Sequence, residues 1–146
     1  MSGDINERFT SFLHTIQLQD IRPMELHSKA SGSTPPQGSG LQLEWRYAFA
    51  KGDPIASQLE IKVFRPKYEF NIKFNGSIIF EHTSKFIISF KVINAEAYEQ
   101  LWAEEDLRKA FMEQQIQKTL WPLLRQHIHD GMSRLGLSPV TLPWVL

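Results

Sequence analysis

The spacing of apolar side chains changes once along this chain, and that change limits the folds available to it. Between residues 41 and 92 apolar residues recur mainly at every second position, which is typical of strands with one buried face. After Asn94 they recur three or four positions apart, which predicts helices. Strands followed by helices predict an α+β fold, here a four-stranded antiparallel β-meander with C-terminal helices packed on it. With 146 residues, the chain is expected to form one domain, 1–146.

The clearest strand spans residues 41–49, and one of its faces is strongly apolar. That face carries Leu41, Leu43, Trp45, Tyr47 and Phe49. A second alternating run covers 59–74 and changes phase at Pro66, which predicts a bulge or a break there. The dipeptide Asn75-Gly76 predicts a two-residue hairpin turn into a last strand over 77–92.

The amino-terminal part is less regular. A short helix is expected over 5–14, and a strand over 16–26 in which Pro23 indicates an edge position or a bulge. Residues 28–40 are rich in serine, glycine and proline without an apolar face, so they predict a flexible loop.

Two polar or special residues organise the helical part. The Asn94 side chain can cap the first helix. Pro122 lies within the helical pattern, where it either kinks a helix or begins a second one.

Composition limits the partners of the chain. Sixteen basic and sixteen acidic residues give a formal net charge of zero, so no positive surface for nucleic acid is expected. Without cysteine, neither a disulfide nor a thiolate site can form. No secretory signal or long apolar run is present, so we expect a cytoplasmic protein that does not insert into membranes.

Signals for catalysis are weak. His127 and His129 stand two positions apart on a predicted helix, so they face different directions and cannot share a metal. The acidic run Glu104-Glu105-Asp106 fits the start of a helix better than acid/base work. Neither a nucleophile motif nor a glycine-rich phosphate loop occurs, so we expect no enzyme activity, no catalytic residue, no metal and no cofactor.

Apolar residues exceed what one core needs. Trp45, Tyr47 and Phe49 either cover the core or form an exposed or subunit-facing aromatic strip, and the sequence leaves both open. The tail 137–146 is also apolar and must lie against something.

The helical part and the tail resemble the SecB family. Leu120-Trp121-Pro122-Leu-Leu-Arg125-Gln is similar to the Leu-Phe-Pro-Tyr-x-Arg-Glu segment of that family. Ser133-Arg134, followed by Leu135-Gly-Leu137-Ser-Pro139-Val-Thr-Leu142-Pro143, resembles the family's Ser-Arg and Phe-Pro-x-Leu-x-Leu-x-Pro. Upstream, Ile16-Gln-Leu-Gln-Asp20-Ile21 is similar to its first strand.

This resemblance implies an ATP-independent chaperone that holds unfolded polypeptide or precursor proteins in apolar grooves, and that assembles as a dimer of dimers. The residues expected to contact the client are Leu41, Leu43, Trp45, Tyr47, Leu137, Leu142 and Trp144. The helix residues Trp121, Leu124 and Ile128 are expected at an oligomer interface.

Two departures from the export chaperones of the family bear on the partner. The chain is neutral and ends at Leu146 without a further helix, so delivery of precursors to SecA is not expected. The run from Arg134 to Leu142 is similar to SecB-like chaperones of toxin–antitoxin systems, so a client set dedicated to an antitoxin is an alternative. A module that binds a small hydrophobic ligand between sheet and helices is the alternative from another class.

Overall fold

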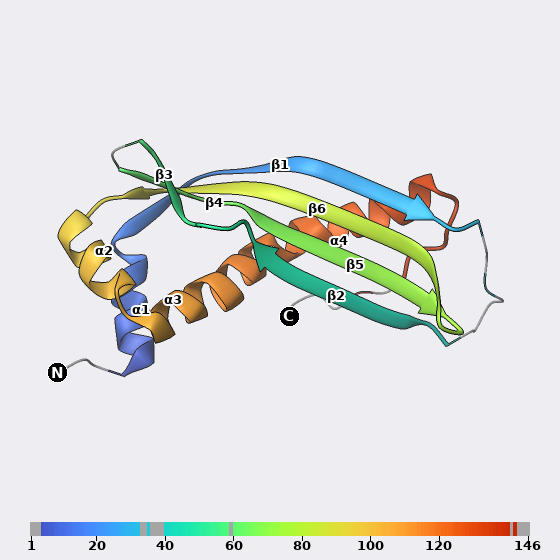
Figure 1. Cartoon of the computed structure of the whole chain (residues 1–146), viewed down its shortest axis with the longest axis horizontal. Coiled ribbons are helices and arrows are strands. Elements are labelled where there is room, and N and C mark those ends of the chain that lie inside the picture. Colours follow the sequence, from blue (N-terminus) through green and yellow to red (C-terminus); the bar gives the residue numbers. More distant parts are fainter. Residues whose placement is uncertain (1–3, 33–34, 36–39, 59, 141, 143–146) are drawn as a thin grey trace.

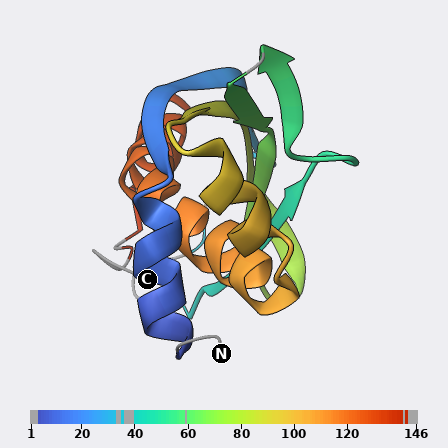
Figure 2. The same cartoon turned by 90° about the vertical axis from the view of Figure 1, so that its left-hand side faces the viewer.

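The structure is a computed structural model that describes residues 4–32, 35, 40–58, 60–140 and 142. It consists of an antiparallel sheet with a long helical run across one face (Figure 1). Two short helices pack at one end of this run, where Figure 2 views the molecule end-on. The α+β class predicted from the sequence is therefore confirmed.

Within the described residues, six strands form the sheet. They are β1 (Ile16–Ala30), β2 (Gln42–Phe49), β3 (Ile55–Gln58), β4 (Ile61–Phe64), β5 (Pro66–Phe74) and β6 (Ser77–Val92). The long β6 pairs with β1 along one side and with β5 and β4, end to end, along the other. Beyond these, β2 pairs with β5 and β3 pairs with β4.

The predicted number and order of strands need correction. The described residues form six strands rather than four. Two pairs of strands share a row of the sheet: β4 and β5 lie end to end in one row, and β3 and β2 lie end to end in the next. The order is also not a simple meander, because β1 pairs with the last strand instead of β2. A connection as long as 31–41 can reach roughly 36 Å when extended, well beyond the roughly 14 Å across three strand spacings. Such a length allows β1 and β2 to occupy opposite edges.

Local signals in the strands are confirmed. The expected break falls at Arg65, between β4 and β5. Asn75 and Gly76 have φ values of 50° and 78° and join β5 to β6, as a type I′ turn requires. Pro23 lies in an edge strand, and the pairing with β6 shifts register directly after it.

The expected loop over 28–40 begins too early. Ser28, Lys29 and Ala30 belong to β1, where they pair with residues 80–82 of β6. The Ser28 hydroxyl also lies 2.7 Å from Nδ1 of His82. A polar segment thus becomes a strand because its neighbour supplies the pairing. Residues 33–34 and 36–39 of the expected loop lie outside the described residues.

The helices are α1 (Ile5–Leu13), α2 (Ala95–Trp102), α3 (Glu105–Ala110), the π-helix η1 (Phe111–Gln115) and α4 (Ile116–Arg134). Asn94 caps α2 as predicted, because its Oδ1 accepts a hydrogen bond from the Ala97 N–H at 3.1 Å. Pro122 lies inside α4 and not at the start of a helix. Since proline has no N–H, α4 lacks the hydrogen bond that would join residue 122 to the carbonyl of residue 118.

An ion pair that the sequence did not reveal fastens α1 to the start of α3. Arg8 donates to Glu104 at 2.6 Å and to Asp106 at 2.8 Å. The acidic run therefore lies at a helix start, as expected, and in addition holds two helices together.

The main core lies between the sheet and the helical run. Its largest fully buried side chains come from α1, the sheet and the helical run, and include Phe12, Phe64, Tyr68, Phe86, Phe111 and Trp121. Trp121, Leu124 and Ile128 are 1%, 0% and 0% exposed. These three side chains form core within one chain, so they are not available to contact a second copy as the sequence predicted. The apolar stripe that marks them as a contact surface is satisfied by the sheet of the same chain.

Candidate functional site

The aromatic face of β2 is turned toward the helices. Leu43, Trp45 and Tyr47 pair with Ile72, Phe70 and Tyr68, whose side chains are buried under the helical run. Opposed residues in an antiparallel pair lie on the same face of the sheet. This decides the question that the sequence left open, in favour of the helix-covered face.

Because β2 is the outer strand of its row, the helices cover its aromatic residues only in part. Trp45 remains 38% exposed, although its ring centroid lies 5.9 Å from that of Trp121 and 6.3 Å from that of Phe70. Its indole thus has one face on the core and another on the surface. A large amphipathic ring in this position can contact a further apolar group at low entropic cost.

Tyr47 is held more firmly than Trp45. Its hydroxyl donates to the Met112 carbonyl at 3.2 Å. Burial raises the pKa of this phenol well above its usual range, and the neighbouring Tyr68 adds to the shift. Tyr47 is therefore a neutral hydrogen-bond donor that connects β2 to the helical run.

The chain beyond α4 turns back along the same face. After Gly136, with φ of 78°, Leu137, Val140 and Leu142 pack against the buried cluster that includes Phe70 and Phe80. Leu43 of β2 packs against that cluster as well. The tail and β2 thus lie on one apolar patch beside α4.

A hollow remains between the tail and α4. Its volume is about 440 Å³, and it is lined by Arg125, Gln126, His129, Pro139, Val140 and Leu142. We call the region between β2 and α4, which holds the tail and this hollow, the tail groove.

The tail groove contains most of the residues predicted to bind a client. Leu43, Leu137 and Leu142 share its buried cluster, and Trp45 and Tyr47 continue its wall along β2. Leu41 stands just before β2 and is 38% exposed. Trp144 lies outside the described residues. Val140 belongs to the groove but was not predicted, although its spacing from Leu137 and Leu142 in the tail could have indicated it.

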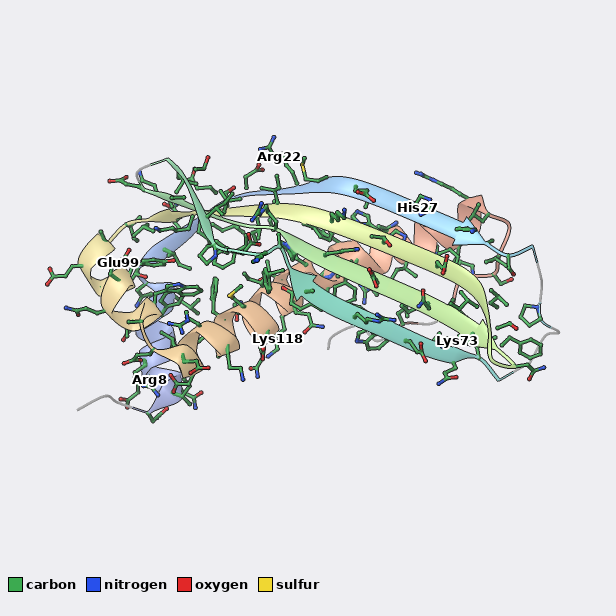
Figure 3. The ribbon with its side chains drawn as sticks, in the orientation of Figure 1. Arg8, Arg22, His27, Lys73, Glu99 and Lys118 are labelled. Atoms are coloured by element: carbon green, nitrogen blue, oxygen red, sulfur yellow. The ribbon has the colours of Figure 1, made fainter. Side chains whose placement is uncertain are left out.

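The outer margin of β1 is a second apolar surface, and the sequence did not single it out. Among the described strands β1 pairs with β6 alone, and its Leu18, Met24 and Leu26 are 46%, 60% and 51% exposed. Arg22 and His27 mark the course of β1 in Figure 3, on the side of the sheet away from β2. The sequence pattern places Leu18, Met24 and Leu26 in a strand but does not show that they stay exposed, because exposure depends on which strands β1 pairs with.

A buried polar chain crosses from β1 to α4. His82 Nδ1 lies 2.7 Å from the Ser28 hydroxyl, His82 Nε2 lies 2.7 Å from the Ser84 hydroxyl, and that hydroxyl lies 3.3 Å from His127 Nδ1. Burial, together with the charges of His127 and His27, lowers the pKa of His82 to about 4. Burial also lowers the pKa of His127. His82 and Ser84 are 3% and 0% exposed, so this chain joins sheet to helix rather than offering a nucleophile to a substrate.

An apolar hollow of about 410 Å³ opens on the opposite face of the sheet. Three irregularities meet there: the bulge of β1 at Met24, the break at Arg65 and the end of β2 at Phe49 and Ala50. Ion pairs join Arg65 to Asp53, Lys67 to Glu69 and Lys85 to Glu25 around it. Since each cation of the rim is paired, the hollow carries no charge that would select an anion.

The geometry of the histidines agrees with the sequence. The His127 ring stacks on Phe86 at 5.6 Å between centroids, whereas the His129 side chain is 59% exposed. In the described part of the chain, no three His, Asp or Glu side chains converge as a metal site would need. None of the helices described combines the length and apolar character that a membrane crossing requires.

In three dimensions the chain is similar to the SecB-like chaperone Rv1957 of Mycobacterium tuberculosis, whose structure is in complex with a ChAD peptide from the HigA1 antitoxin. The TM-score is 0.68, the match covers 97% of this chain and 98% of that chain, and the identity is 18%. Comparisons with protein-family models and with curated proteins yield no match. At this identity the likeness shows the fold, which is the SecB-like fold that the sequence predicted.

Proposed function

We propose that this chain, which has the SecB-like fold, is an ATP-independent chaperone that holds unfolded or aggregation-prone polypeptide in the tail groove. The observation that carries the proposal is the aromatic wall of β2. Leu43, Trp45 and Tyr47 form a continuous apolar strip, one side of which remains open to solvent. Apolar contact without a charged or hydrogen-bonded anchor favours many extended segments without reading their sequence closely.

Backbone pairing supports the same role. Among the described strands, β2 pairs with β5 alone, so its other edge has unpaired backbone groups. An extended client could hydrogen-bond to this edge while its side chains enter the groove.

The test is suppression of aggregation. A chemically unfolded client is diluted into buffer without nucleotide, and light scattering is followed with equimolar chaperone. We expect the native chain to suppress scattering and Trp45→Ala to bind the client about tenfold more weakly, as loss of a central aromatic anchor does. Arg46→Ala is the matched control, because Arg46 is exposed on the other face of the same strand. Undiminished scattering with the native chain would contradict the proposal.

A dedicated client is the second candidate. The similar structure holds a peptide from an antitoxin, which favours an aggregation-prone antitoxin as the natural client here. This version predicts at least tenfold tighter binding of a cognate antitoxin than of an unrelated unfolded protein, measured by fluorescence anisotropy. Equal affinities would favour a general chaperone over a dedicated one. Delivery of clients to SecA is not part of either version of the proposal.

Self-association through β1 is the third part of the proposal. A strand of this length with one unpaired edge and exposed Leu18, Met24 and Leu26 is a hazard in a monomer, and pairing with a second copy removes it. Sedimentation velocity is expected to show an oligomer that Leu26→Lys converts to a smaller species, while Leu123→Lys, an exposed leucine of α4, leaves it unchanged. A native monomer would rule this assembly out.

The small-ligand alternative receives less support. Core side chains fill the interface between sheet and helices, where that alternative placed its pocket. Native mass spectrometry distinguishes the two functions, because a ligand module would carry a small molecule and a chaperone would be recovered empty.

A further inference from the structure

We propose that the tail, described over residues 137–140 and 142, is a tethered substitute for the client. The tail occupies the tail groove and has to leave it when a client binds. The inference rests on the proposed function and adds two things to it: a competitor inside the chain, and the chemistry of the client that displaces it. On this view Leu137 and Leu142 do not contact the client but stand in for it.

Side-chain packing holds the described part of the tail in the groove. Leu137 N–H donates to the Met132 carbonyl at 2.9 Å, which completes the end of α4. Beyond Leu137, no backbone hydrogen bond joins residues 138–140 or 142 to another described residue. Leu137, Val140 and Leu142 pack against the buried cluster with their side chains. A segment attached in this way can leave without breaking any part of the sheet or the helices.

The tail also fits its groove loosely. The hollow of about 440 Å³ beside Val140 and Leu142 is larger than a tryptophan side chain. Pro139 has no backbone N–H, so at that position the tail cannot donate to the free edge of β2. The described part of the tail thus contacts the apolar wall of the groove, while the hollow stays open beside it and no backbone–backbone hydrogen bond joins it to β2.

These features define the client that would displace the tail. It is an extended, uncharged segment with apolar side chains three and two positions apart, as in Leu137, Val140 and Leu142. It carries a tryptophan or tyrosine that fills the hollow, where Gln126 and His129 can contact its polar edge. It has no proline in its centre, so that it can pair with β2. Tethering gives the tail a high effective concentration, so weak clients are excluded and strong ones bind.

The first experiment weakens the tail in the full chain. The probe is fluorescein-labelled α-lactalbumin, reduced and carboxymethylated so that it stays unfolded, and anisotropy gives its Kd. Leu142→Asp puts a charge on a docked side chain and is expected to bind the probe about tenfold more tightly, because the groove is then open in more of the molecules. Ile93→Asp places the same charge on an exposed apolar residue near α2 and should leave Kd unchanged. Weaker binding by Leu142→Asp would overturn the inference, because the tail would then be part of the binding surface.

The second experiment fixes the tail in place. Since the chain has no cysteine, Leu43→Cys with Val140→Cys introduces one pair, which a short bis-maleimide can join across the groove. Joining is expected to weaken binding of the probe at least tenfold relative to the same double variant capped with N-ethylmaleimide, which carries both substitutions and an adduct on each cysteine but leaves the tail free. Unchanged binding after joining would overturn the inference while leaving the holding function intact. If neither the native chain nor any variant binds the probe, the proposed function fails, and the inference fails with it.

Discussion

Gly131 lies where α4 packs closely against β1, and its replacement tests this contact between the helix and the sheet. A Cβ built at Gly131 would overlap the Ser28 hydroxyl, lie 3.0 Å from the Ser28 Cβ and lie 3.4 Å from Cζ of Phe80. An alanine therefore requires Ser28 or α4 to move. Movement of Ser28 would also remove its contact with His82 Nδ1.

The magnitude follows from three effects of Gly131→Ala. Alanine stabilises a helix interior by about 0.5–1 kcal/mol relative to glycine. Overpacking costs about 1–3 kcal/mol, and an unsatisfied nitrogen of the buried His82 costs about 1–3 kcal/mol more if Ser28 turns away. We expect a net loss of about 1–4 kcal/mol in the free energy of unfolding, which lowers Tm by several degrees in a chain of this size.

Urea unfolding followed by circular dichroism, at one protein concentration, measures the loss. The matched background is Ser28→Gly, which removes both atoms of Ser28 that crowd the new methyl group. In that background Gly131→Ala should be neutral or stabilising by up to about 1 kcal/mol, so the two sites couple by about 1–5 kcal/mol. Equal destabilisation in both backgrounds would refute the contact with Ser28, and stabilisation in the native background would refute the close approach itself.

Three further perturbations follow from the structure. Histidine in the unfolded chain gains a proton below about pH 6.5, whereas folded His82 gains one only below about pH 4, so the free energy of unfolding should fall as pH drops from 6.5 toward 4, by at most about 1.4 kcal/mol per pH unit. The urea midpoints at pH 7 and pH 5 measure this fall, and an equally large fall in His82→Gln would contradict the assignment to His82. Tyr47→Phe removes the hydrogen bond to the Met112 carbonyl and should lower the free energy of unfolding by about 1 kcal/mol, while client affinity stays unchanged. Urea unfolding checks the first expectation and fluorescence anisotropy the second. Asn94→Ala removes the cap of α2 and should lower the free energy of unfolding by about 1 kcal/mol, whereas Asn94→Ser should retain most of the stability. Equal losses for the two variants in thermal unfolding would mean that capping is not the cause.

Local chemistry allowed much of the fold to be predicted. The turn at Asn75 and Gly76, the break beside Pro66, the cap at Asn94 and the strand over 77–92 each depend on residues close together in sequence. Turn geometry, helix capping and the alternation of apolar residues along a strand each depend on a few neighbouring residues, so they can be predicted from the sequence. The likeness of residues 120–143 to the SecB family added the arrangement of these elements, and the structural comparison bears that fold out.

Non-local contacts decided what the sequence left open or misplaced. Ser28 to Ala30 look like a loop and become a strand because β6 supplies the pairing. Trp121, Leu124 and Ile128 look like a contact surface and are core, because the sheet of the same chain covers them.

The tail belongs to the family-like signature, and its Leu137, Leu142 and Trp144 are predicted to contact a client. The described part of the tail lies in the groove beside β2. The sequence by itself determined that this segment is apolar, uncharged and in need of a surface to cover. Which surface it covers was decided only by the tertiary structure, because that depends on β2 meeting α4 and the tail, from which β2 lies far apart in the sequence. The hydrophobic effect is non-directional, so it favours burial of the tail without selecting a surface; the assembled sheet and helices supply that surface.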